Sequence, residues 1–353
     1  MVFTTLLLGW YGDNGRDLPW KTYKDPYTIW VSEVILQQTR VQQGEAYFRN
    51  FISTFPTVRH LAEASVDDVL KLWQGLGYYS RARNMHKTAR KIVDEYGGMF
   101  PKDVESLKKL DGIGPYTASA VASFAYGIPA VALDGNGYRI LARYFGIDLP
   151  LGSPSAVKTF RELAVSLLPE GKSADFNQAL MDFGSLVCMP RPLCVSCPLA
   201  DHCIAYNTGL AESLPVKPRK AGHRTRYFHY LDFGQDTFTF IGQRKGNDIW
   251  KGLYEFPLIE TSMPATYPDL IRSERFRILV GTSDYVLNNT QALKPHKLTH
   301  QSIHPVFYRI SITGPAPNLE KEYKKVPREE LSKYAVSRLT EKYMNFFHNF
   351  AGL

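Results

Sequence analysis

Cysteine is scarce in this 353-residue chain, and long apolar runs are absent from it. All four cysteines lie between Cys188 and Cys203, a crowding that in a reducing compartment favours a metal site over disulfide bonds. The leucines at residues 6–8 form only a short apolar run with no basic segment before it, so we expect neither a signal peptide nor a membrane span. These absences predict a cytoplasmic protein.

The length and the charge give two further expectations. A chain of 353 residues is too long for one ordinary core and suits two domains. Its 44% hydrophobic and 22% charged residues are typical of globular proteins. The formal net charge of +8 favours a polyanion such as nucleic acid as partner, although a solvated basic surface would also account for it.

The spacing of apolar residues changes along the chain. Up to about residue 207 they recur every three or four residues, which predicts helices. Residues 215–226 (PVKPRKAGHRTR) then carry five Lys or Arg and no acid, typical of an exposed linker. Beyond them, alternating aromatic and β-branched residues predict strands. We therefore expect a mainly helical domain over residues 1–208, a basic linker over 209–225 and a smaller α+β domain over 226–353.

The cysteine loop has a spacing suited to metal binding. Cys188, Cys194, Cys197 and Cys203 are separated by five, two and five residues. Four thiolates in one short loop can hold a single metal centre, and the Cys-x-x-Cys pair supplies two ligands from one turn. Spacing alone leaves zinc and a 4Fe-4S cluster equally open.

A glycine turn precedes a helix within residues 107–127 (LKKLDGIGPYTASAVASFAYG). Gly112 and Gly114 would allow a tight turn and expose backbone amides where the helix begins near Tyr116, an arrangement that binds a phosphate. A plain connecting turn is the alternative. A dinucleotide-binding turn is excluded because the preceding residues look helical rather than extended.

Two carboxylates stand in contrasting settings. Asp25 and Pro26 are typical of a helix start, and Glu33 lies among the apolar residues of the helix that follows. Burial there would raise its pKa and keep it protonated as a general acid requires, whereas a solvated polar face is the alternative. Asp134 precedes another helix and should stay ionised, either as a charge stabiliser or simply as an N-cap.

Taken together, several motifs resemble the helix-hairpin-helix DNA glycosylases, and most closely the MutY-type adenine DNA glycosylases. The resemblance covers about residues 10–205 and places the helix-hairpin-helix at about 107–127. The stretch GNDIWKGLYEFP extends it to a Nudix-like second domain. The motifs that carry it are RDLPW, WVSEVILQQTRV, GLGYYSRARN, LDGIGPYTA, LDGN, FNQALMDFG and the cysteine loop.

The resemblance implies base excision repair by a DNA N-glycosylase that flips adenine out of a mispair with 8-oxoguanine or guanine. Glu33 would protonate the adenine, Asp134 would stabilise the oxocarbenium-like sugar, and Tyr116 and Asn136 would complete the site. Bifunctional relatives carry a lysine at the position of Tyr116 and form a Schiff base with the sugar. Tyrosine cannot, so we expect a monofunctional enzyme.

The resemblance also implies contacts to the duplex. Tyr78 would wedge into the base stack with Gln38 beside it, and Arg81 would hold a phosphate. Thr299 and His300, in the segment Leu298-Thr299-His300, would read the modified base. The remaining residues expected to bind DNA or substrate are Lys21, Gln37, Leu76, Gly112, Gly114 and Gln178.

The implied cofactor is a structural 4Fe-4S cluster held by the four cysteines, and the implied partner is double-stranded DNA bound by a monomer. Four departures from the family pattern stand out: the first cysteine interval is five residues where six is usual, Lys21 replaces an arginine, Asp111 a proline, and Gly137 a valine. None removes a proposed catalytic group.

Other interpretations remain. An endonuclease III-like lyase would need an amine at Tyr116. A Nudix pyrophosphatase would need a run of metal-binding acids after GLYEFPLIE, where TSMPATYPDLIRSERF has none. A non-enzymatic DNA-binding module leaves Glu33 unexplained. His296, His300 and His304 recur every four residues, but Pro295 and Pro305 bracket them and favour a loop over a zinc-binding helix.

Overall fold

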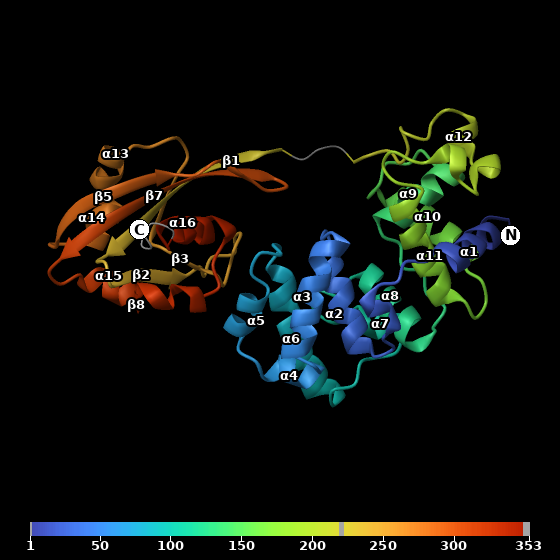
Figure 1. Ribbon diagram of the computed structural model, residues 1–353, viewed down its shortest axis with the longest axis horizontal. Coiled ribbons are helices and arrows are strands. Elements are labelled where there is room, and N and C mark those ends of the chain that lie inside the picture. Colours follow the sequence, from blue (N-terminus) through green and yellow to red (C-terminus); the bar gives the residue numbers. More distant parts are fainter. Residues whose placement is uncertain (1, 219–221, 349–353) are drawn as a thin grey trace. The chain divides into compact units, whose positions relative to one another are not determined.

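The computed structural model describes residues 2–218 and 222–348, which fall into two compact units. One unit combines Met1–Glu63 with Asn84–Lys220, and the other combines Ala64–Arg83 with Ala221–Leu353. The expected fold class is confirmed, because helices dominate the first part of the chain and a strand-rich α+β part follows (Figure 1).

The first unit is a bundle of helices. It contains α1 (Val2–Asn14), η1 (Pro19–Thr22), α2 (Pro26–Leu36), α3 (Val41–Thr54), α4 (Val58–Glu63), most of α6 (Ser80–Tyr96), α7 (Val104–Leu107), α8 (Pro115–Tyr126), α9 (Gly135–Tyr144), α10 (Pro154–Leu167), α11 (Ser173–Leu186), η2 (Cys194–Ser196), η3 (Ala200–His202) and α12 (Ile204–Asn207).

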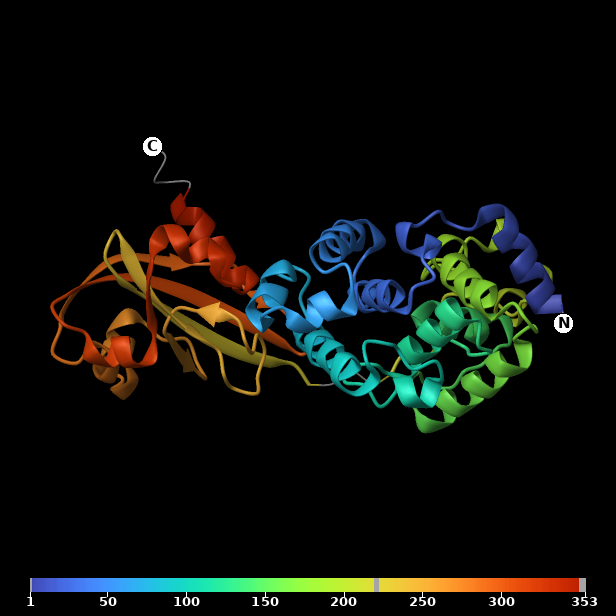
Figure 2. The ribbon, with the colours of Figure 1, turned by 90° about the horizontal axis from the view of Figure 1, so that it is seen from below.

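Helix α2 is the buried helix of this bundle. It starts as expected, with an Asp25 carboxylate oxygen accepting a hydrogen bond from the Thr28 amide at 2.8 Å and Pro26 in the first turn. Residues 27–35 are all buried, and α2 contacts both α3 and α8 (Figure 2). A helix that is apolar on every side is buried in this way. Glu33 is therefore buried together with the apolar residues on either side of it in α2.

The turn between α7 and α8 depends on one of its two glycines. Gly112 has a φ of 75°, and a Cβ there would lie 2.7 Å from the Cβ of Asn84. Both observations require glycine at this position. Gly114, the N-cap of α8, has an extended backbone, and a Cβ there would meet nothing within 4 Å. The tight turn is therefore explained by Gly112 alone.

The second unit is built on one sheet in the order β3-β2-β1-β7-β5, with β1 and β7 parallel. Its elements are α5 (Val66–Leu72), β1 (Arg224–Gly234), β2 (Phe238–Gln243), β3 (Tyr254–Glu255), β4 (Leu258–Thr261), α13 (Tyr267–Arg272), α14 (Glu274–Val280), β5 (Asp284–Ala292), β6 (His296–Lys297), β7 (Gln301–Thr313), α15 (Pro317–Glu322), β8 (Lys324–Pro327), η4 (Arg328–Lys333) and α16 (Arg338–His348).

Alternating side chains of β1 pack on opposite faces of this sheet. Phe228 and Tyr230 join a cluster with α16, whereas Leu231 and Phe233 join a cluster with α13, α14 and α15. Successive residues of a strand point to opposite faces, so aromatic residues in both registers allow helices to cover the sheet on each side.

The ends of the expected linker are part of the folded units. Arg143 donates a hydrogen bond to the Leu214 carbonyl, and the Leu151 amide donates one to the carbonyl of Val216. Strand β1 already begins at Arg224. Residues 219–221, at the centre of the expected linker, lie outside the described residues.

The three regularly spaced histidines do not share a helix face. His296 lies in β6 and His304 in β7, and these strands pair in antiparallel fashion with a turn at residues 298–300 between them. The loop expected between Pro295 and Pro305 is confined to this turn, which carries His300, because the residues on either side of it pair as strands. Within the described residues, no helix has the length and apolar character needed to cross a membrane.

Candidate active site

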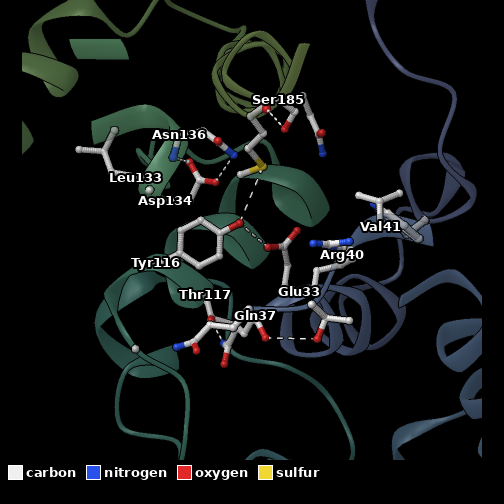
Figure 3. A pocket seen from close by; sticks show the side chains of 18 of the residues that line it. Glu33, Gln37, Arg40, Val41, Tyr116, Thr117, Leu133, Asp134, Asn136 and Ser185 are labelled. Atoms are coloured by element: carbon white, nitrogen blue, oxygen red, sulfur yellow. Dashed lines mark hydrogen bonds between the residues drawn. The ribbon is translucent and has the colours of Figure 1, made fainter. Parts of the chain in front are cut away.

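A cavity of about 900 Å³ opens in the first unit, lined by α2, α8, α9, α11 and the segments between them (Figure 3). It brings together residues that are far apart in the sequence, from Arg16 to Ser185. Nine of the expected site residues line it: Glu33, Gln37, Gln38, Gly112, Gly114, Tyr116, Asp134, Asn136 and Gln178.

Glu33 is a buried acid rather than part of a solvated face, since only 6% of it is exposed. The Tyr116 hydroxyl donates a 2.6 Å hydrogen bond to one of its carboxylate oxygens (Figure 3). Burial raises the pKa of Glu33 to about 7, the Tyr116 hydrogen bond lowers it, and the nearby charge of Asp134 raises it. A carboxyl group with this pKa is poised to donate a proton near neutral pH.

Asp134 is the N-cap of α9. One of its carboxylate oxygens accepts from the amides of Asn136 and Gly137 at 2.9 and 2.8 Å, and the other accepts from the Asn136 side chain at 2.7 Å. Burial raises the pKa of Asp134, and these hydrogen bonds oppose that rise. Capping and catalytic roles are therefore compatible, because the bonds that cap the helix also stabilise the ionised carboxylate.

Asn136 is itself held by Arg139, which the sequence analysis did not single out. The guanidinium of Arg139 donates to the Asn136 side-chain oxygen at 2.6 Å and to the carbonyls of Gly184 and Cys188 at 2.8 and 2.7 Å. A Cβ at Gly184 would overlap the Asn136 side chain, so glycine permits this close approach of α11 to α9. One arginine thus ties the start of α9 to the cysteine loop.

Asp182 supports a second arginine at the cavity. Its fully buried carboxylate accepts from the backbone amide of Arg16 at 2.8 Å, from the Arg16 guanidinium at 2.8 Å and from the ammonium of Lys21 at 2.6 Å. Arg16 lines the cavity, whereas Lys21 lies behind it with its ammonium bound to Asp182. The signal for Asp182 was available, since it is an acid within an apolar helix, as Glu33 is.

The glutamines expected at the cavity occupy different settings. Gln37 ends α2 and its amide donates to the Thr117 hydroxyl at 3.2 Å. Gln38 follows with a φ of 56°, a left-handed conformation that is uncommon for a residue with a side chain. Gln178 reaches the cavity from α11. The left-handed backbone at Gln38 lies between α2 and α3, and residues 36–41 of this connection line the cavity.

Tyr78 and Thr299, both expected to touch the duplex, meet in the second unit. Their hydroxyl oxygens are 2.9 Å apart, and Tyr78 is 49% exposed with a φ of 47°. A second cavity of about 580 Å³ is lined by both residues and by His300. The hydroxyl groups and the exposed aromatic ring offer contacts suited to a nucleobase.

Leu76 and Arg81, expected to contact DNA, are both 9% exposed. The Arg81 guanidinium lies over the rings of Trp73 and Tyr78, at 5.2 and 5.7 Å, and burial lowers the pKa of Arg81 to about 10. It also donates to the Gly77 carbonyl at 3.2 Å. These contacts tie Arg81 to the turn that carries Tyr78, and its role as a phosphate ligand stays a prediction.

The four cysteines gather in one loop after α11, around η2 and η3. Burial raises the pKa of Cys197 to about 11, and the neighbouring thiol groups of Cys188, Cys203 and Cys194 raise it further. Arg143 donates to the Cys188 sulfur at 3.4 Å, which supplies positive charge beside thiolates. No set of three or more His, Cys, Asp or Glu side chains in the described part of the chain is arranged around a single-ion site.

Two family models match the chain. Residues 31–166 match the HhH-GPD superfamily of base excision DNA repair proteins, and residues 230–346 match the NUDIX domain. The first match contains Glu33, Tyr116, Asp134 and Asn136, and the second contains Thr299 and His300.

The relatives of this chain include adenine DNA glycosylases from bacteria and animals. The one from Buchnera aphidicola subsp. Acyrthosiphon pisum is 35% identical over 313 residues, covering 88% of this chain and 87% of the relative. The one from Homo sapiens is 42% identical over 214 residues, covering 58% of this chain and 39% of the relative.

Solved structures agree with the fold of the helical part. A thermostable thymine-DNA glycosylase superposes with a TM-score of 0.54 at 31% identity, covering 59% of this chain and 96% of that one. An endonuclease III from a DNA complex superposes at 0.52 with 21% identity over 59% of this chain and 95% of its own, a likeness of fold alone. The chain therefore belongs to the adenine DNA glycosylase family, DNA N-glycosylases of base excision repair that share the helix-hairpin-helix fold.

Proposed function

We propose that this glycosylase removes adenine mispaired with 8-oxoguanine or guanine in double-stranded DNA, with Glu33 as the general acid. The observation that carries the proposal is the buried Glu33 carboxyl group, with a pKa of about 7, at a cavity that can receive a flipped nucleotide. Both adenine opposite 8-oxoguanine and adenine opposite guanine lie within this substrate class.

Glu33 donates its proton to the adenine ring as the N-glycosidic bond breaks. The bonding electron pair leaves with the base, and the sugar becomes an oxocarbenium-like cation. The carboxylate of Asp134, held by Asn136 and Gly137, offsets this positive charge. Water then adds to the sugar, and its proton restores the acid form of Glu33.

Tyr116 holds the Glu33 carboxyl group in place and carries no amine. Its hydroxyl donates to Glu33 at 2.6 Å, and burial raises the pKa of Tyr116 well above its usual value, so it remains a neutral donor. A Schiff base with the sugar needs a nucleophilic amine. The proposed reaction is therefore monofunctional and ends at an abasic site.

The turn at residues 298–300 is proposed to read the base opposite adenine. Thr299 and His300 are exposed at the tip of the β6–β7 hairpin, and Thr299 lies beside the hydroxyl of Tyr78. The proposal gives Tyr78 the role of a wedge in the base stack and gives the two turn residues hydrogen bonds to the edge of 8-oxoguanine.

A 4Fe-4S cluster is the proposed occupant of the cysteine loop. Cys188, Cys194, Cys197 and Cys203 would hold it, and Arg143 would balance part of the negative charge. Four thiolates in one short loop can hold either zinc or a 4Fe-4S cluster, and the resemblance to the MutY-type glycosylases favours the cluster. The cluster would hold the loop together beside α9 and α11.

Replacing Glu33 with Gln tests the proposed acid. We expect single-turnover excision of adenine opposite 8-oxoguanine to fall by roughly 10² to 10⁴-fold, because an amide cannot supply the proton. Binding of the same duplex should persist in a gel-shift assay, and wild type should leave adenine opposite thymine intact. Excision at the wild-type rate by Glu33→Gln would exclude this residue as the acid.

The pH profile should report the pKa of Glu33. Its acid form predominates below about pH 7, so single-turnover excision should decline as the pH rises through that value. Tyr116→Phe removes a hydrogen bond that lowers this pKa, and the decline should move to higher pH. Tyr126→Phe is the control. Tyr126 lies in α8, as Tyr116 does, and its hydroxyl donates to the Phe100 carbonyl and not to Glu33. An unshifted profile in Tyr116→Phe would contradict the assigned coupling.

The cysteine loop predicts a coloured protein. Purified wild type should show the broad visible absorbance of an iron-sulfur cluster and contain iron and sulfide, and Cys197→Ser should lose both. Ser196→Ala, one residue earlier in the loop, should keep them. A colourless wild type with stoichiometric zinc would refute the cluster.

The turn at residues 298–300 predicts a loss of discrimination. His300→Ala should lower the preference for 8-oxoguanine over guanine opposite adenine by about 1 to 3 kcal/mol, the usual value of a good base contact. His304→Ala is the matched control, because His304 lies in β7, outside the turn, and packs beside Tyr227 of β1. If the ratio of the two single-turnover rates stays at the wild-type value in His300→Ala, the turn does not read the base.

A further inference from the structure

Arg226, near the start of β1, has a side chain that is only 4% exposed. Its Nε donates to Glu260 at 2.7 Å, and one terminal nitrogen donates to Asp248 at 2.9 Å and to the Gln301 side chain at 3.2 Å. The other terminal nitrogen donates to Asp248 at 2.7 Å and Glu260 at 2.6 Å. These five bonds use all five donors of a guanidinium.

The three partners come from three separate segments. Glu260 lies in β4, Asp248 lies in the connection between β2 and β3, and Gln301 is the first residue of β7, directly after His300. The backbone adds to this link, since the Arg224 amide donates to the His300 carbonyl at 3.0 Å. Arg226 therefore joins the turn at residues 298–300 to the connection that carries Asp248.

Those two segments are walls of the same cavity in the second unit. Residues 248–250 line it on one side, and residues 296–301 line it as well. Arg226 is not among the lining residues, so it acts from behind the wall. Its planar guanidinium holds both segments at once, because it binds the Asp248 carboxylate through two hydrogen bonds and the Gln301 side chain through one.

Stability alone is a poor explanation for this cluster. Arg226 and Arg244 both lie against the ring of Phe228, at 4.7 and 5.4 Å, and both bind Asp248. Burying such charges costs desolvation energy, and apolar side chains of similar volume often stabilise a core equally well. Directional hydrogen bonds supply what apolar packing does not, a fixed geometry for the attached segments.

We propose that Arg226 is a positioning residue for lesion discrimination: it sets the turn at residues 298–300 against the Asp248 segment, so that Thr299 and His300 meet the edge of the base. This inference rests on the proposed role of that turn. It adds that the turn depends on a buried guanidinium outside the turn, one that touches neither DNA nor substrate.

Arg226→Lys tests the inference. Lysine keeps the charge but has a single nitrogen and cannot hold two carboxylates bidentately. We expect the ratio of single-turnover rates, adenine opposite 8-oxoguanine over adenine opposite guanine, to fall about tenfold, the equivalent of one displaced hydrogen bond. The rate opposite guanine should stay near wild type, whereas the thermal midpoint should fall, because lysine leaves several carboxylate oxygens without a donor.

Arg275→Lys is the matched control, because Arg275 pairs with Glu322 and Tyr323 in the same unit without contacting either segment. Gln301→Leu is the second variant and decides the matter if Arg226→Lys does not fold. It cuts only the side-chain bond from Arg226 to the turn and should lower the ratio in the same direction.

The outcomes separate the inference from the function it rests on. A wild-type ratio in Arg226→Lys and Gln301→Leu, with a lowered ratio in His300→Ala, overturns the positioning role and leaves the reading turn standing. A wild-type ratio in His300→Ala overturns both. Proportional losses on the two substrates in Arg226→Lys would show a general structural role and also overturn the inference.

Discussion

The hydrogen bond between the Tyr116 hydroxyl and the Glu33 carboxyl group is the interaction on which the cavity depends. It joins α2 to α8 at 2.6 Å across 83 residues of sequence. Burial alone would raise the pKa of Glu33 further, and this bond opposes that rise. The balance leaves a carboxyl group that can both release and recover a proton near neutrality.

Around this pair, three further residues that line the cavity are each held by a neighbouring polar side chain. Asp182 fixes Arg16, Arg139 fixes Asn136, and Asn136 fixes Asp134. The supporting partners lie on α9 and α11, which pack against each other. Such support holds reacting groups in position before substrate arrives, which lowers the reorganisation needed during the reaction.

Much of the helical part was predictable from local sequence. The cap at Asp25, the start of α8 and the N-cap at Asp134 follow from residue type, and the apolar residues around Glu33 predicted its burial. Contacts between distant segments were not predictable, because no local pattern indicates which acid meets which base. Arg139 and Arg226 were missed for this reason, whereas Asp182 did have a local signal, an acid among apolar residues. Arg81 was expected to hold a phosphate, and the structure places its guanidinium over the ring of Trp73, eight residues earlier.

Arg139 connects the cysteine loop directly to the start of α9. One rigid, planar group binds the Cys188 carbonyl and the Asn136 side chain, at 2.7 and 2.6 Å. Because the guanidinium is planar, the directions of these two hydrogen bonds are fixed relative to each other. The end of α11 and the start of α9 are therefore held together by a single side chain, in addition to their apolar packing.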